Sequence, residues 1–435
     1  MASSARIDGS VVLPGAGDIV TVFSRGWAVD HDFGADPDRV VGSGQPRRIS
    51  SLGWPAPFDR DLDGVLAGQG AYADFVYVFA GGKYLRLRAD TLTPDGEPRD
   101  IAGPWSLPAS WTHIDAVFTG GGVKSGFAYF FRGNEYQRYD WLRDAVSYPA
   151  PRPIAPHWHV DDPLLAGDFD GAITGRGAWH TKVWLFKRVK ATVDDHGALV
   201  PAGGHVVSAP RYLRYDFNSE TVDFVESVPA DAVTNWKGLL PLVDSGEAVD
   251  EAVAWLNASI AALDAGIPTP ALTTAFGHHI MTTSPDAASL VTFVTRLTAA
   301  RVILEAIPAR FAWAVIDEFP AHTYPPPNTR TEVGDLFSTR NGPHARSASL
   351  IHEAVHATLF DTIGTSRVDV PEWSGATING HDWSPAVDPT THIQLPAYHT
   401  ISTADALENP SSYAAFAVEI GTGADARYGA GRPQE

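Results

Sequence analysis

The sequence predicts a multidomain chain with an all-β first half of four repeated units and a mainly α (α+β) second half. A motif of an apolar residue, an aspartate and a small residue recurs four times, starting at positions 7, 62, 114 and 169. Near Asp244 the alternating pattern of the first half stops, and apolar residues begin to recur with a 3.6-residue period. The 435 residues suffice for two or three domains. We expect domains at 1–240 and 241–420, followed by a flexible tail at 421–435.

Composition excludes several classes of function. The formal net charge is −19 and no run is rich in Lys or Arg, which argues against nucleic acid or an anionic membrane as the main partner. The chain has no cysteine, so a metal must be held by His, Asp or Glu. No segment has the pattern of a secretory signal or a transmembrane helix. The expected location is the cytoplasm of the producing cell, or a target reached by export or injection without a signal.

Each repeat in the first half predicts a strand pair with a tight turn. Alternating residues surround Gly81-Gly82 in Val76–Arg88 and Gly133-Asn134 in Phe127–Tyr139. The units are about 50–55 residues apart, a period typical of β-propeller blades. In the fourth unit, an insertion at about 188–209 separates the two strands. The anchor aspartates should cap turns and the aromatic residues should fill blade cores. Each unit ends near a tryptophan, at Trp54, Trp111, Trp158 and Trp236.

The first half resembles a hemopexin-like domain, a four-bladed propeller, over roughly residues 5–240. The resemblance is carried by the string Tyr129–Asp140 and the preceding Ile114–Phe118. It implies backbone carbonyls that point into a central channel, which in that family often holds a structural calcium, sodium or chloride ion. It also implies a domain that docks a protein substrate or receptor. Family members often join the first and last blades by a disulfide, so closure here must depend on strand pairing and packing.

Helical periodicity predicts two helices before residue 310. The first spans Ala248–Leu263, and the second runs from about 284 to 307. Its predicted inward residues are Leu290, Val294, Leu297 and Ile303. Ala312–Asp317 is a strand or a short helix, and Gly334–Ser338 is a short strand, with an extended break at Tyr324–Pro327 between them.

The motif His352-Glu353-Ala-Val-His356 carries the chemistry of the second half. It lies in a predicted helix from about Ser347 to Gly364, which places the two imidazoles one turn apart on one face. Two such imidazoles can share one tetrahedral zinc ion, and the glutamate can take a proton from the water that zinc activates. Ile351, Val355 and Leu359 form the neighbouring buried stripe.

The third zinc ligand stays open. Asp361 faces the wrong side of the helix, so Asp369 is the better candidate and Glu372 the next. Four further residues remain possible: His381, Asp388, His392 and His399.

Residues 330–420 resemble the aspzincin metallopeptidases, which are deuterolysin-like and peptidyl-Lys metalloendopeptidases. Ser349–Ala357, the following Gly364-Thr365 and the segment Ala406–Phe416 carry the resemblance. It implies that His352 and His356 are zinc ligands, Glu353 the general base and Asp369 the third ligand. In zincins an edge strand holds the substrate, a role for Gly334–Ser338. Two phenols are available to stabilise the tetrahedral intermediate, Tyr398 and the more core-like Tyr413.

The sequence therefore predicts a zinc metalloendopeptidase that a propeller directs to a protein substrate or receptor. One alternative is a binding or toxin-like protein in which the propeller is the active part and the zinc site is vestigial. Another is a peptidase that acts as an injected effector inside a foreign cell.

Overall fold

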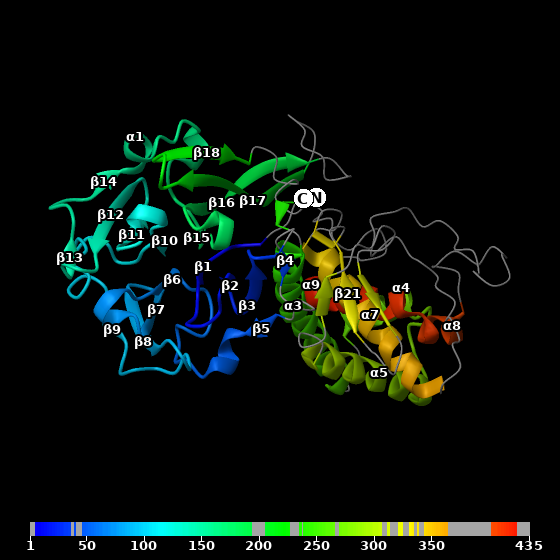
Figure 1. Cartoon of the computed structure of the whole chain (residues 1–435). Coiled ribbons are helices and arrows are strands. Elements are labelled where there is room, and N and C mark those ends of the chain that lie inside the picture. The colour runs from blue at the N-terminus through cyan, green and yellow to red at the C-terminus, as the bar shows by residue number, and fades with distance from the viewer. Residues whose placement is uncertain are drawn as a thin grey trace. The chain divides into compact units, whose positions relative to one another are not determined.

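The structure is a computed structural model, and it describes residues 5–35, 39–40, 46–193, 205–226, 235–236, 238–265, 269–306, 311–313, 321–324, 330–334, 337–338, 343–363 and 402–423. The chain forms two compact units, which divide between Val243 and Asp244. The first is all-β and the second is mainly helical (Figure 1).

The first unit is a four-bladed propeller of antiparallel sheets that follow one another along the chain (Figure 1). The first blade contains β1 (Gly9–Val11), β2 (Ile19–Ser24), β3 (Trp27–Asp32), β4 (Arg39–Val40) and β5 (Arg47–Arg48). The second contains β6 (Gly64–Ala67), β7 (Phe75–Ala80), β8 (Lys83–Arg88) and β9 (Arg99–Asp100). The third contains β10 (Ala116–Thr119), β11 (Phe127–Arg132), β12 (Glu135–Asp140), β13 (Ala145–Val146) and β14 (Arg152–Pro153). The fourth contains β15 (Gly171–Thr174), β16 (Lys182–Val193), β17 (His205–Asp216) and β18 (Thr221–Val225).

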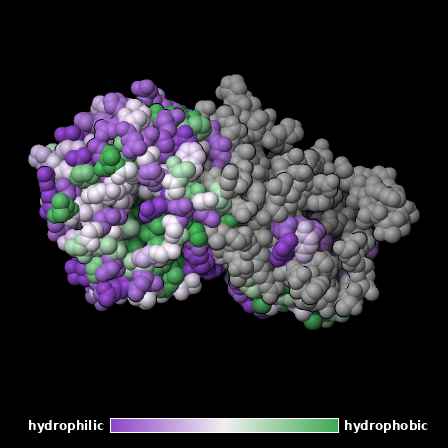
Figure 2. All heavy atoms as spheres, viewed as in Figure 1, coloured by the Kyte–Doolittle hydropathy of each residue, from purple (hydrophilic) through white to green (hydrophobic). Residues whose placement is uncertain are grey.

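Short helical segments connect these strands. They are η1 (Ile49–Leu52), η2 (Gly70–Tyr72), η3 (Gly122–Lys124), α1 (Ile154–Trp158), η4 (Pro163–Leu165) and η5 (Gly177–Trp179). The four predicted tryptophans are all buried in the blades. Figure 2 shows hydrophilic and hydrophobic residues mixed on the visible face of the propeller, with hydrophilic ones along its rim.

Three of the four anchor aspartates cap the turn of their blade hairpin, as the repeat predicts. The carboxylate of Asp63 accepts a hydrogen bond from the backbone N–H of Gly81 at 2.7 Å, in the turn between β7 and β8. Asp115 accepts the equivalent bond from the N–H of Gly133 at 2.5 Å. Asp8 accepts the matching bond from the N–H of Arg25, in the turn between β2 and β3. Asp170 accepts from the N–H of Arg188, which lies within the longer strand β16 rather than in a turn. Each anchor thus holds the start of its first strand to the hairpin that follows.

Packing and side-chain bonds close the ring of blades. The inner strands β1, β6, β10 and β15 contact one another in turn, and β15 contacts β1. A Cβ atom on Gly171 would lie only 2.1 Å from the carbonyl oxygen of Ile7, so the last blade approaches the first at backbone distance. The N–H of Thr174 donates to Ser10 Oγ at 3.1 Å across the same junction. Among the described residues no sheet spans this junction, so strand pairing has no part in closure there.

The fourth blade corrects the expectation of an insertion at about 188–209. Strands β16 and β17 pair continuously from Lys182 with Asp216 to Val193 with His205. Residues 188–193 and 205–209 of the expected insertion therefore belong to the hairpin ladder, and the residues between them lie outside the described part of the chain. Alternation continues through Val189, Ala191 and Val193, so the pattern was compatible with a longer strand.

The second unit places helices around a small three-stranded sheet. The helices are α3 (Leu239–Asp264), α4 (Pro270–His279), α5 (Ala287–Ala306), α7 (Pro343–Ile363), α8 (Thr403–Glu408) and α9 (Pro410–Thr422). The sheet has the order β19 (Phe311–Trp313), β21 (Thr331–Val333), β20 (Ala321–Thr323). β19 is parallel to β21, and β20 is antiparallel to it.

Two helix predictions need correction. Helix α3 begins at Leu239, not Ala248, and its first residues Leu239–Val243 are all buried, so they show no amphipathic pattern. In α5 the fully buried residues are Phe293, Leu297, Ala300 and Leu304, and of the predicted inward residues only Leu297 is among them.

Helix α5 is also long and apolar enough to cross a membrane, judged by length and composition alone. It packs against α7, and its Arg296 pairs with Glu408 at 2.8 Å. A core helix of a soluble protein passes the same test, so one such helix is weak evidence of a membrane span.

Candidate metal centre

Helix α7 carries the HExxH motif and is held by packing on its apolar side. It contacts α5, α9 and β20. Ile351, Ala354 and Val355 are fully buried, whereas His352, Glu353 and His356 are only half-buried. The apolar stripe thus anchors the helix, and the three polar side chains of the motif lie together outside that core. The predicted stripe residue Leu359 has a side chain outside the described part of the chain.

The two histidines converge on one point. The Nε2 atoms of His352 and His356 lie 3.0 Å apart, and their ring centroids are 4.6 Å apart. Two zinc–nitrogen bonds of about 2.0–2.1 Å at a tetrahedral angle require a separation of roughly 3.3 Å. The pair therefore fits one shared zinc ion with almost no rearrangement.

A serine from helix α9 orients the first histidine. Ser411 Oγ lies 3.3 Å from His352 Nδ1, on the side of the ring opposite the shared point. When Nδ1–H donates to this hydroxyl, Nε2 keeps its lone pair and can bind a metal. The segment Ala406–Phe416, which carries the resemblance to the aspzincins, spans the end of α8 and the start of α9, where Asn409 and Pro410 begin the second helix.

Glu353 is held by the edge of the small sheet. The backbone N–H of Thr323, the last residue of β20, donates to Glu353 Oε2 at 2.8 Å. β20 pairs only with β21 in the described sheet, so its other edge faces the motif helix. The edge strand was predicted at Gly334–Ser338, and this was wrong because Phe337 and Ser338 are helical.

Buried charges fix the start of α7, which begins at Pro343 rather than near Ser347. The Arg346 guanidinium is buried and lies 3.0 Å from Asp244 Oδ1. It also donates to the backbone oxygens of Phe337 and Ser338, at 3.0 and 2.9 Å. These contacts hold α7 in place at Arg346, six residues before His352, the first histidine of the motif.

The remaining predicted site residues divide into two groups. Tyr413 is fully buried in the core, where its hydroxyl donates to the Leu407 oxygen at 2.8 Å and its ring stacks on Phe293 at 4.6 Å. Burial raises its pKa to about 12, although Arg296 lies beside it. The other group lies outside the described residues and keeps its predicted roles untested: Asp361 (side chain only), Asp369, Glu372, His381, Asp388, His392, Tyr398 and His399.

A second group of potential metal ligands was not predicted. His278 and His279 end helix α4, and Glu419 comes from α9. Glu419 Oε2 lies 2.8 Å from His279 Nε2, and both carboxylate oxygens lie 3.0 Å from His278 Nδ1. Burial would raise the pKa of Glu419, but the bonds to the two histidines outweigh it and the pKa is lowered. The His-His pair was visible in the sequence, but nothing there indicated its partner.

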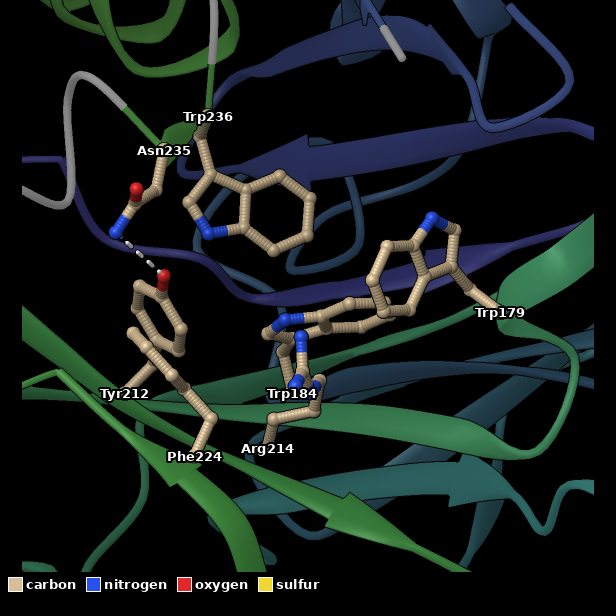
Figure 3. A pocket seen from close by; sticks show the side chains of 7 residues that line it. All are labelled: Trp179, Trp184, Tyr212, Arg214, Phe224, Asn235 and Trp236. Carbon is tan, nitrogen blue, oxygen red and sulfur yellow. Dashed lines mark hydrogen bonds between the residues drawn. The ribbon is translucent and has the colours of Figure 1, made fainter. Parts of the chain in front are cut away.

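The propeller contains an aromatic pocket in its fourth blade. Its volume is about 170 Å³. Trp184, Tyr212 and Trp236 are buried at its base, and the Arg214 guanidinium lies over the ring of Trp179 at 5.0 Å. Figure 3 shows these rings around the cavity, with the hydrogen bond from Asn235 to the Tyr212 hydroxyl at 3.0 Å. The pocket is lined by Trp179, Trp184, Tyr212, Arg214, Phe224, Asn235 and Trp236.

Comparison with known solved structures finds neighbours of several kinds, among them the following three. A hemopexin fold protein, CP4 from cow pea, is 17% identical over 53% of this chain and 95% of its own, with a TM-score of 0.39. A plant lectin with two metal-binding sites from Cicer arietinum is 16% identical over 53% of this chain and 95% of its own, also with a TM-score of 0.39. A zinc peptidase from Grifola frondosa is 16% identical over 41% of this chain and 94% of its own, with a TM-score of 0.29. No family model matches the chain. Identities of 16–17% do not place the chain in a family.

Proposed function

We propose that the protein is a zinc-dependent endopeptidase whose centre lies on helix α7. One observation carries the proposal: the Nε2 atoms of His352 and His356 lie 3.0 Å apart, next to a glutamate that an edge strand holds. Among common biological metals, zinc suits paired imidazole ligands with a carboxylate nearby. We expect Asp369 to be the third zinc ligand.

The residues of the chain would divide the work of peptide hydrolysis. Bound zinc supplies Lewis acidity to the substrate carbonyl and to the attacking water. Glu353 takes the proton of that water at its carboxylate and delivers it to the leaving amine. The Thr323 N–H holds Glu353 Oε2 in the resting site, at 2.8 Å. Because β20 pairs with no second strand in the described sheet, we propose that an extended substrate adds as a strand along the edge that faces α7.

Replacing the general base tests this mechanism. Glu353→Gln should keep zinc at the wild-type level and lower the cleavage rate of casein by about 10²–10⁴-fold, because the amide cannot take a proton. Zinc per chain is measured by mass spectrometry of the metal, and cleavage by release of new amino termini. Glu305→Gln, an exposed glutamate on α5, is the matched control and should behave as wild type. Full activity of Glu353→Gln would refute the mechanism.

We also propose that the propeller recruits the protein substrate through its aromatic pocket. The support is a cavity of about 170 Å³ with three tryptophans and an arginine, a lining that suits apolar or aromatic side chains. The same pocket also favours the alternative of a binding protein, in which the propeller is the active part and the zinc site is vestigial. That alternative predicts no peptide cleavage.

Substrate size separates recruitment from catalysis. Trp179→Ala should raise the KM for casein and leave cleavage of a short fluorogenic peptide unchanged, because casein has residues outside the cleaved segment that can enter the pocket and the short peptide has none. Leu142→Ala removes another exposed apolar side chain of the propeller and is the control. Equal effects of Trp179→Ala on both substrates, or on neither, would contradict recruitment by this pocket.

A further inference from the structure

We propose that His278, His279 and Glu419 bind a second zinc ion, a structural one that joins helix α4 to helix α9. One donor atom from each of the three residues lies within 4.8 Å of the other two. The nitrogens that contact the Glu419 carboxylate are His278 Nδ1 and His279 Nε2. This site is separate from the centre on α7 and does not depend on peptidase activity.

Two consecutive histidines can reach one ion because they use different nitrogens. Neighbouring residues on a helix point about 100° apart, so identical atoms of both rings would diverge. Here His278 offers Nδ1, close to its backbone, and His279 offers Nε2, at the far end of its ring. Their ring planes meet at 86°, so the two lone pairs approach Glu419 from different sides. This arrangement places three donors around one point from only two helices.

Distances around Glu419 fit zinc after a small expansion. Tetrahedral zinc with bonds of about 2.0–2.2 Å separates its donor atoms by roughly 3.3–3.6 Å. The observed separations from the carboxylate are 2.8 Å to His279 Nε2 and 3.0 Å to His278 Nδ1. Two nitrogens and a carboxylate are a typical donor set for zinc. His278 is 18% exposed, which gives an ion a path from solvent, whereas His279 is fully buried.

The electrostatics of the site favour a cation. Helix α4 ends at His279, and Glu419 lies in the last turn of α9, which ends at Thr422. Both helix ends carry partial negative charge, and the buried carboxylate adds a full one. A divalent zinc ion supplies the positive charge that this site favours, and neutral imidazoles are the form that binds it.

The position of the site gives the ion a structural purpose. Ser411, which orients His352, and Glu419 are eight residues apart on α9, about 12 Å along the helix. An ion that fixes the C-terminal part of α9 to α4 therefore steadies the helix that supports the first motif histidine.

Counting metal in the full-length chain tests the proposal. After chelation, reloading with zinc and removal of the excess, we expect two zinc ions per wild-type chain. His352→Ala should retain one ion, and Glu419→Gln should retain the one on α7. Because Glu419 is buried, His278→Ala at the partly exposed ligand is the second variant. Loss of an outer-shell partner alone costs about 10–100-fold in affinity, so loss of this direct ligand should lower the zinc affinity of the site by at least about 100-fold. His180→Ala, an exposed histidine of the propeller, is the control and should retain both ions.

Thermal unfolding in the His352→Ala background isolates the second site from catalysis. Zinc at about 100 times its Kd should raise the Tm by roughly 5–10 °C, and adding His278→Ala should abolish most of that rise. If the His352→Ala chain holds no zinc, or if His278→Ala and Glu419→Gln leave its content unchanged, the proposal is wrong. If the wild-type chain binds zinc at the second site but not at the α7 centre, the result would instead contradict the proposed peptidase.

Discussion

The buried pair of Asp244 and Arg346 makes the sharpest stability prediction for the helical unit. Asp244→Asn removes the negative charge and keeps the shape, so the Arg346 guanidinium stays buried beside a neutral amide. Both side chains are at most 2% exposed, so water cannot replace the lost partner. The guanidinium keeps its bonds to the backbone oxygens of Phe337 and Ser338.

The size of the effect follows from the geometry. At 3.0 Å and an effective dielectric constant of about 20, the two charges attract by about 5–6 kcal/mol. Removing one partner of a buried pair costs about 3–5 kcal/mol in proteins. Asparagine can still bond the Ser338 hydroxyl, which lies 2.5 Å from the aspartate, so we expect about 3 kcal/mol.

Urea unfolding of the full chain, followed by circular dichroism at 222 nm, measures this loss in the helical unit. A double-mutant cycle with Arg346→Met provides the control. The second change removes the charge that Asp244→Asn leaves unpaired. The loss in the free energy of unfolding of the double variant should therefore be smaller than the sum of the two single losses, by at least about 2 kcal/mol. Additive losses, or a loss below about 1 kcal/mol for Asp244→Asn, would show that the pair is not buried as described.

Three further predictions concern pH, closure and metal binding. The hydrogen bond with Glu251 raises the pKa of His344 above its usual 6.5, so this contact should stabilise the fold fully below pH 6.5 and be lost as the pH rises through the raised value. His344→Ala should flatten that part of the pH–stability curve, and an unchanged slope would contradict it. Gly171→Ala should lower propeller stability by about 1–3 kcal/mol through a backbone clash, whereas Gly126→Ala, with open space around it, should not. Differential scanning calorimetry of the Gly171→Ala and Gly126→Ala variants measures the difference in propeller stability. Ser411→Ala should weaken zinc binding at the α7 centre about 10–100-fold, and an unchanged Kd from competition with a chelator would exclude its orienting role.

The propeller was predictable because its signals are local and repeated. Each anchor aspartate accepts a hydrogen bond from a backbone N–H that lies 17 or 18 residues later in the same blade. A short-range pattern repeated four times therefore predicts both the strands and their caps. The length of the fourth hairpin was not predicted. The sequence of β16 contains no turn signal, so it fits a long strand as well as a short strand followed by an insertion.

The candidate site was predictable only along one helix. His352, Glu353 and His356 lie within five residues, so helical geometry alone places them together. The strand that reaches Glu353 ends at Thr323, and three residues are too few to show alternation. The contact between His279 and Glu419 joins residues 140 apart, which no local pattern can predict.

The junction between the first and last blades has a mechanical consequence. No described sheet crosses any junction between blades, and this junction also lacks the connecting chain that joins consecutive blades. Opening the ring here therefore breaks lateral packing at Gly171 and the bond from Thr174 to Ser10, but no strand ladder and no chain connection. A pulling force applied across the ring should therefore part the molecule at this seam first, leaving an open arc of four intact sheets. Amide exchange should show the same order, with the Thr174 amide losing protection before the hairpin amides of β11 and β12.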